Sequence, residues 1–247
     1  MEHIGDTLEN ARSGRGKDAE REQLRQASID RASAAFGYGL GPGLVEYIRD
    51  IRRRQEEGQA AYDITALLWQ LAGIPPDPIQ TFAKFKLNKQ YPTLKEALEA
   101  TREWSHFKGK PFLTLAGPAG VGKSFLAVAA TQEIVANGGL VIYRRVVDLL
   151  KELRQDSFEQ RRSDVDTDFR QVTFLIVDDL GVQKSSEWAL ESLDDLVDFR
   201  YSTKRRLMVC TMAKSEDLPP RIADRLADGL IGQVVQIAAP SYRRGRK

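Results

Sequence analysis

An eight-residue segment holds the residue types that bind phosphate: Gly117-Pro118-Ala119-Gly120-Val121-Gly122-Lys123-Ser124. It fits the pattern of a glycine, four residues of any type and then Gly-Lys-Ser, which defines a P-loop. Glycines allow backbone conformations that a Cβ atom forbids, so backbone N–H groups can converge on phosphate oxygens. We expect Lys123 to neutralise the β- and γ-phosphates of a nucleoside triphosphate and Ser124 to ligate Mg²⁺.

The sequence around this segment supplies the context that a P-loop needs, a strand before it and a helix after it. The apolar run 112–116 predicts a buried strand. Residues 125–136 are rich in Ala, Leu, Val and Ile and end at Asn137-Gly138-Gly139, which predicts a helix and its stop. A chance glycine-rich turn is therefore the weaker interpretation.

Two consecutive carboxylates, Asp178 and Asp179, follow the apolar run 174–177. They would emerge at the carboxyl end of a buried strand, where ligands bind in open α/β sheets. We expect Asp178 to hold Mg²⁺ through water and Asp179 to polarise the water that attacks the γ-phosphate. The plain alternative is a pair of turn residues at a strand end, which the P-loop makes less attractive.

Helices and strands alternate from about residue 79 onward, which is typical of an α/β fold with a parallel sheet covered on both faces. The predicted strands span 112–116, 140–144, 172–177, 207–211 and 233–237. The predicted helices span 93–107, 125–136, 147–154, 187–201 and 219–226.

The sequence before residue 79 has a different character. Residues 1 to about 35 are polar and charged and predict a mobile arm or a helix that orders on binding. Residues 44–73 predict a helical hairpin, whose second helix is capped by Asp63 and ended by Gly73. The Pro-rich run 75–78 predicts a linker. We therefore divide the chain into 1–78, a mobile arm and hairpin expected to bind a partner, and 79–247, the nucleotide-binding domain.

The apolar face of the first hairpin helix has two interpretations. It could contact a partner, or it could pack on the second helix, which is the more common use of such a face. The residues of this face are Leu44, Tyr47, Ile48 and Ile51.

Composition limits the other possibilities. The chain has 247 residues, with 37 basic and 35 acidic side chains and a net charge of +2, which excludes a histone-like polycation but not a local basic groove. One cysteine, Cys210, excludes a disulfide framework and a cysteine-based zinc site. No segment resembles a signal peptide or a membrane span, so we expect a cytoplasmic protein without membrane contact.

The stretch Val177-Asp178-Asp179-Leu180-Gly181 resembles the Walker B element of the DnaC/DnaI helicase loaders and the related IstB transposition ATPases. The similarity extends over about residues 79–243 and is carried by Tyr91-Pro92-Thr93-Leu94, Val147-Asp148-Leu149-Leu150, Trp188, Leu193, Arg200-Tyr201, Asp224-Arg225-Leu226 and Pro240-Ser241-Tyr242-Arg243. The resemblance implies a P-loop NTPase of the AAA+ class with ATP and Mg²⁺ as cofactors.

In that class the site forms between subunits, and an arginine from the neighbour touches the γ-phosphate. The resemblance points to Arg225 for this role, with Arg221 in reserve, although both could be a solvated helix face. Arg243 falls where a nucleotide-sensing arginine is expected, but a basic tail explains it equally well.

One position departs from the family. Where relatives carry Thr-Asn after the fourth core strand, this chain has Thr211-Met212. Methionine makes no useful hydrogen bond to a lytic water. Either Thr211 takes over this role, or hydrolysis is slow and ATP acts mainly as an assembly switch.

A pair of basic residues, Arg144-Arg145, lies at the exit of the predicted second strand. In a ring or spiral this exit would face the channel, so the pair could contact single-stranded DNA through its phosphates. Tyr143 could stack on a base, although a strand tyrosine is more often a core residue.

The function implied by the resemblance is to load a replicative helicase onto single-stranded DNA through ATP-dependent homo-oligomerisation. The first alternative is an IstB-like transposition helper, whose partner is a transposase. A second alternative is a non-hydrolysing, ATP-gated adaptor. A small-molecule kinase is disfavoured by the paired aspartates and the Arg225 segment.

Overall fold

The computed structural model describes residues 44–57, 64–158, 165–181 and 186–242. Its described part contains a five-stranded sheet with the order β2-β3-β4-β1-β5, in which all neighbours are parallel. The strands are β1 (Phe112–Ala116), β2 (Val141–Arg145), β3 (Phe174–Leu180), β4 (Arg206–Thr211) and β5 (Gly232–Gln236). The predicted α/β fold with a parallel sheet is confirmed, with small shifts at the strand ends.

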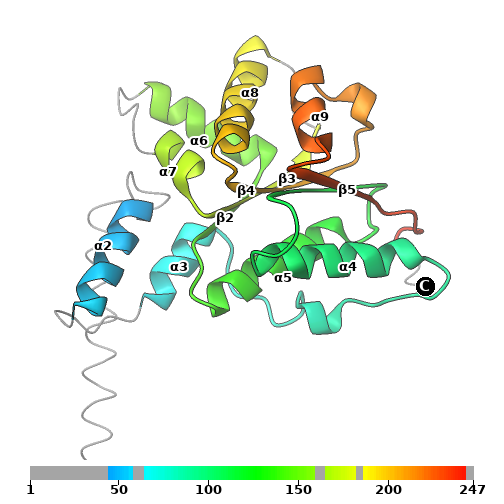
Figure 1. Cartoon of the computed structure of the whole chain (residues 1–247), viewed down its shortest axis with the longest axis horizontal. Coiled ribbons are helices and arrows are strands. Elements are labelled where there is room, and N and C mark those ends of the chain that lie inside the picture. Colours follow the sequence, from blue (N-terminus) through cyan, green and yellow to red (C-terminus); the bar gives the residue numbers. More distant parts are fainter. Residues whose placement is uncertain (1–43, 58–63, 159–164, 182–185, 243–247) are drawn as a thin grey trace, which may run out of the picture.

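Helices cover both faces of this sheet (Figure 1). One face carries α4 (Pro92–Ser105) and α5 (Lys123–Ala136), and the other carries α6 (Val146–Phe158), α8 (Glu187–Ser202) and α9 (Pro220–Ala227). Every residue of β1 and β4 is buried, because parallel strands inside such a sandwich have no solvent face. Three short helices escaped prediction: η1 (Phe82–Lys84), α7 (Val165–Gln171) and η2 (Ser215–Asp217).

The hairpin helices α2 (Leu44–Glu56) and α3 (Thr65–Ala72) pack against the sheet domain. Ile48 and Ile51 are buried in the same hydrophobic core as the sheet, so this part of the face is used for packing. α3 lies against β2 and α5, and α2 lies against α7. The core therefore continues across residue 78, where the sequence suggested a boundary. Asp63 and the side chains of Leu44 and Tyr47 lie outside the described part.

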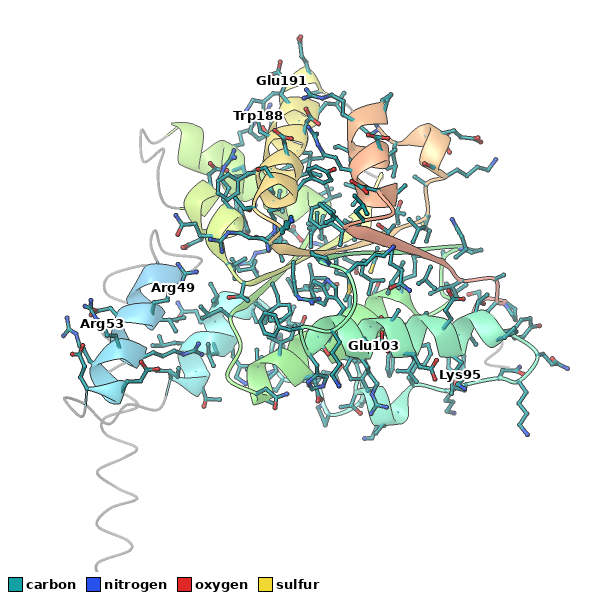
Figure 2. All side chains as sticks on the ribbon, viewed as in Figure 1. Arg49, Arg53, Lys95, Glu103, Trp188 and Glu191 are labelled. Carbon is teal, nitrogen blue, oxygen red and sulfur yellow. The ribbon has the colours of Figure 1, made fainter. Side chains whose placement is uncertain are left out.

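A polar contact adds to this packing. The Arg49 guanidinium on α2 donates to the backbone oxygen of Gln171 at 3.0 Å, at the end of α7. Figure 2 labels Arg49 and Arg53 on α2 and shows side chains filling the layers on both sides of the sheet. The hairpin is thus fixed to the sheet domain by apolar contacts and by hydrogen bonds.

A buried arginine secures the amino end of β3. Arg200 on α8 is completely buried, and its two terminal nitrogens donate to backbone oxygens of the segment before β3 and of the first residue of β4. The acceptors are Phe169, Arg170, Val172, Thr173 and Arg206. Burial lowers the pKa of Arg200 to about 9, so the side chain is still a cation at neutral pH. This arginine ties the segment before β3 to the start of β4.

Candidate nucleotide-binding site

The loop between β1 and α5 has no room for a side chain at Gly120 or Gly122. Gly120 has φ +80° and Gly122 has φ +108°, a region that side chains rarely adopt. A Cβ atom on Gly120 would lie 2.2 Å from the Ser241 hydroxyl, and one on Gly122 would lie 2.8 Å from the Phe85 ring. The loop therefore presents its backbone at these positions, and both glycines are required by conformation and by space.

The amino end of α5 is prepared for an anion. Its N-cap is Gly122, which offers no side-chain cap, and its first turn has no acidic residue. The positive end of the helix is therefore not neutralised by a side chain of its own. Lys123 is 5% exposed, and its Nζ donates to the backbone oxygens of Gly117 at 2.7 Å and Pro118 at 2.8 Å. This holds the ammonium group against the loop, and Ser124 follows it in the first turn.

The segment after β5 closes the loop from the other side. The Tyr242 N–H donates to the Gly120 oxygen at 2.8 Å, and the Ile237 N–H donates to the Ala116 oxygen at 2.8 Å. Ser241 lies beside Gly120. The chain leading to Arg243 is therefore anchored on the P-loop, whereas Arg243 itself lies outside the described residues.

The two aspartates lie near the carboxyl end of β3, at the same end of the parallel strands as the P-loop that follows β1. The pairing of β3 with β4 is regular up to Val177 and then shifts, because Asp179 takes a left-handed backbone conformation with φ +58°. Such a conformation is uncommon outside glycine and is better tolerated by aspartate than by most residues. It breaks the strand alternation that would send consecutive side chains to opposite faces. Asp178 is 2% exposed, and Asp179 is half-buried.

Asp178 is held by both carboxylate oxygens. Oδ1 accepts from the Asp179 N–H at 2.9 Å, and Oδ2 accepts from the Tyr143 hydroxyl at 2.6 Å. Burial, followed by the charge of Asp178, raises the pKa of Tyr143 far above its usual range, so the hydroxyl stays a donor. The same two causes raise the pKa of the Cys210 thiol, which is buried in β4. The tyrosine is therefore partly buried against the core, with its hydroxyl engaged by Asp178.

Thr211 joins the two halves of the site. Its hydroxyl donates to the Leu180 oxygen at 2.7 Å and accepts from the Ala213 N–H at 2.9 Å, while its backbone oxygen accepts from the Gly117 N–H at 3.2 Å. The side chain is 1% exposed. These bonds give Thr211 a structural role at the junction of β3, β4 and the P-loop. Met212 beside it is 45% exposed and brings no hydrogen-bonding group.

The two arginines of α9 differ sharply in exposure. Arg225 is only 13% exposed, because its guanidinium pairs with Asp194 at 2.7 Å and with Asp198, both on α8. Arg221 is 72% exposed and reaches the other oxygen of Asp194 at 2.8 Å. The structure thus holds Arg225 within its own subunit and presents Arg221 at the surface.

The two arginines of β2 do not form a common basic surface. The Arg144 side chain is 10% exposed, and its Nε pairs with Glu152 at 2.7 Å. One terminal nitrogen donates to the oxygens of Ala72 and Tyr143, against Gly73 at the end of α3. The prediction that Arg144 binds DNA is corrected here, because its guanidinium is used inside the protein. Arg145 is 57% exposed and pairs with Asp148 at 2.7 Å.

None of the described helices combines the length and apolar character needed to cross a bilayer.

Comparisons with known proteins agree with this architecture. Relatives include the replicative helicase loader DnaC of Escherichia coli K12, 28% identical over 125 residues that make up 49% of this chain and 47% of the relative. They also include the putative insertion sequence ATP-binding protein y4pL of Sinorhizobium fredii, 28% identical over 141 residues, 55% of this chain and 58% of the relative. The chain thus spans about half the length of these curated relatives.

Solved structures share the fold. A crystal structure of the DnaC helicase loader has a TM-score of 0.57 and 20% identity, covering 64% of this chain and 97% of that one. Domain III of the Thermotoga maritima replication initiation protein DnaA has a TM-score of 0.60 and 20% identity, covering 68% and 70%. These likenesses show the AAA+ fold. A family model for the IstB-like ATP-binding proteins matches residues 55–247, and the chain belongs to that family.

Proposed function

We propose that this protein is an AAA+ ATPase that assembles on ATP and places a client protein on single-stranded DNA. The observation that carries the proposal is a combination at the carboxyl ends of the strands: the bare backbone of Gly120 and Gly122, the buried Lys123 and the held carboxylate of Asp178. This set of groups suits a triphosphate and its cation. The family to which the chain belongs supports ATP as the nucleotide.

The residues present fit a magnesium ion. Ser124 supplies a hydroxyl oxygen, and Asp178 supplies a buried carboxylate that still has acceptor capacity after its hydrogen bonds to Tyr143, Asp179 and Cys210. Oxygen ligands of this kind are what Mg²⁺ prefers. When bound, the ion would neutralise charge on the phosphates. Lys123 would bind the β- and γ-phosphates, and Asp179 would accept a hydrogen bond from the attacking water.

Hydrolysis by this site is expected to be slow in a single subunit. Thr211 already uses its hydroxyl within the protein, and Met212 cannot bind water, so Asp179 is the group left to orient the nucleophile. A cationic group supplied by a neighbouring subunit can raise the rate of phosphoryl transfer by about 10³–10⁵. We propose Arg221 for this role because it is exposed. Arg225 would first have to leave two carboxylates.

The shared site can be tested with mixed subunits. A Lys123→Ala subunit cannot bind the triphosphate but still offers Arg221 to its neighbour. An Arg221→Ala subunit keeps its own phosphate-binding loop but offers no arginine. Each variant alone should lack ATPase activity, and a mixture should recover part of it. Arg225→Ala replaces Arg221→Ala in a second mixture, and Lys95→Ala, an exposed lysine on α4, serves as the matched control. If ATPase activity is recovered neither in the mixture with Arg221→Ala nor in the mixture with Arg225→Ala, the site is not completed by α9 of a neighbouring subunit.

For the client, we propose a replicative helicase, as the name of the DnaC relatives suggests. The assay is transfer of purified helicase onto circular single-stranded DNA with ATP and with ADP. We place the client contact in residues 1–78. Deletion of residues 1–43 should abolish transfer but leave nucleotide affinity unchanged. If the deletion leaves transfer intact, residues 1–43 do not hold the contact.

A second candidate is the transposition helper, favoured by the insertion-sequence relative and by the family model. Its client would be a transposase. The same DNA-delivery assay with purified transposase distinguishes the two candidates, because the ATPase site is common to both. Arg145 is the exposed β2 residue that we propose for contact with the DNA backbone.

A further inference from the structure

Tyr143 approaches the nucleotide site from the strand next to β3. Its hydroxyl donates to Asp178 Oδ2 at 2.6 Å, while the Asp179 N–H donates to Oδ1 at 2.9 Å. The aspartate is 2% exposed, so bulk water does not compete strongly for these oxygens. Each carboxylate oxygen therefore has a donor, and the buried Cys210 thiol on β4 also hydrogen-bonds to Asp178, so the plane of the carboxylate is fixed.

The sheet register explains how a tyrosine reaches this carboxylate. Tyr143 pairs with Ile176, and Arg145 pairs with Asp178, so Tyr143 and Asp178 are diagonal neighbours two residues apart along the sheet. Side chains two residues apart in a strand point to the same face. A long aromatic side chain can span a diagonal of this kind. The tyrosine hydroxyl at the end of the ring donates to Oδ2, whereas a phenylalanine at this position would leave Oδ2 without this bond.

The chain contains a second tyrosine–aspartate bond that serves as a comparison. The Tyr201 hydroxyl on α8 donates to Asp228 Oδ2 at 2.5 Å. Asp228 lies between α9 and β5, before the amino end of β5, whereas the P-loop and Asp178 lie at the carboxyl ends of their strands. The two bonds have the same chemistry but lie at opposite ends of the parallel strands.

We infer that Tyr143 is a positioning residue for the cation of the ATP site: it holds Asp178 in the orientation needed to receive a Mg²⁺-bound water. The inference rests on the proposed function, since it assigns the cation to Asp178. Partners that orient metal-binding carboxylates are typically worth 10–100-fold in metal affinity or activity. Because Asp178 would act through water, the lower end of that range applies here.

The test measures nucleotide binding and needs no turnover. The affinity of a fluorescent ATP analogue is measured for the full chain in excess Mg²⁺ and again in EDTA. Tyr143→Phe should reduce the gain in affinity that Mg²⁺ provides by about tenfold and leave the affinity in EDTA unchanged. Binding of Mn²⁺ to the nucleotide complex, followed by its EPR signal, should weaken in parallel. Tyr201→Phe, which loses a bond of the same kind, should match the wild type in both measurements.

A double-mutant cycle guards against a general packing defect. In an Asp178→Asn background, Tyr143→Phe should have little further effect on the Mg²⁺-dependent gain, because both changes remove the same arrangement. The inference is overturned if Tyr143→Phe keeps the full gain, if it weakens binding equally in EDTA, if Tyr201→Phe shows the same loss, or if the two changes are additive. The proposed function fails separately, if Lys123→Ala binds the nucleotide as tightly as the wild type.

Discussion

Replacing Arg144 with methionine is expected to destabilise the fold and to leave DNA binding unchanged. The change keeps much of the aliphatic volume and removes the guanidinium, which pairs with Glu152 at 2.7 Å and donates to Ala72 and Tyr143 at 3.1 and 2.8 Å. Removing one partner of a fully buried ion pair costs about 3–5 kcal/mol. Glu152 is 28% exposed and can turn toward water, which reduces that figure. Loss of the bonds to the two backbone oxygens adds about 1–3 kcal/mol.

We therefore expect the free energy of unfolding to fall by about 3 kcal/mol. Urea unfolding followed by circular dichroism measures it, with the slope unchanged if the native fold is kept. Arg145→Met is the matched control, since its guanidinium is exposed and pairs only at the surface, and it should leave the midpoint unchanged. Fluorescence anisotropy with single-stranded DNA completes the comparison. An unchanged midpoint for Arg144→Met together with lost DNA affinity would refute the reasoning and restore Arg144 as a DNA ligand.

Three other substitutions probe separate parts of the molecule. Gly120→Val should reduce ATP affinity at least tenfold by calorimetry, because the new side chain would clash with Ser241 and valine rarely adopts a positive φ. Wild-type affinity would show that the bare backbone at Gly120 is not needed for binding. Asp179→Asn should bind ATP normally and lower the turnover of the assembled protein by about 10²–10⁴ in a phosphate-release assay, and retained turnover would exclude it as the water-orienting group. Arg200→Met should lower the free energy of unfolding by about 3–5 kcal/mol, because it leaves buried backbone oxygens without donors; a loss below 1 kcal/mol would show that water replaces the guanidinium.

The nucleotide site was predictable because its chemistry is local in sequence. The P-loop needs eight consecutive residues and its flanking strand and helix, and the Asp178-Asp179 pair follows its own apolar run. The parallel sheet followed from the alternation of strands and helices. What the pattern does not give is the neighbour of each strand. The bond from Tyr143 to Asp178 depends on β2 lying beside β3.

Charged residues were the main source of error. Arg144 was read as a surface cation because it lies beside Arg145, although one of them is buried and the other is exposed. A run of two arginines at a strand end looks the same in both situations. Arg200 carried a usable signal, since it continues the apolar face of Leu193 and Val197 at helical spacing. A lone arginine on such a face indicates a buried cation with backbone acceptors.

The prolines at 75–78 lie in an irregular segment, as expected of a linker, yet the hydrophobic core extends to both sides of it. Proline excludes regular structure locally, but it says nothing about whether the segments on either side share a core. Ile48 and Leu71 lie before the prolines and still pack with the sheet domain. Whether the two segments share a core depends on tertiary contacts, which the local sequence pattern does not reveal.

The position of α3 against β2 limits how the protein can be dissected in the laboratory. β2 is an edge strand of the sheet, and α3 is one of the helices that pack against it, with α5 and α6. A recombinant fragment beginning at residue 79 would uncover the apolar surface of β2 and α5 and leave the Arg144 cation without its Ala72 acceptor. Uncovered strands at a sheet edge invite association with other chains. Biochemical work on the nucleotide-binding domain should therefore keep both helices of the hairpin, because poor solubility of a shorter fragment would be mistaken for inactivity.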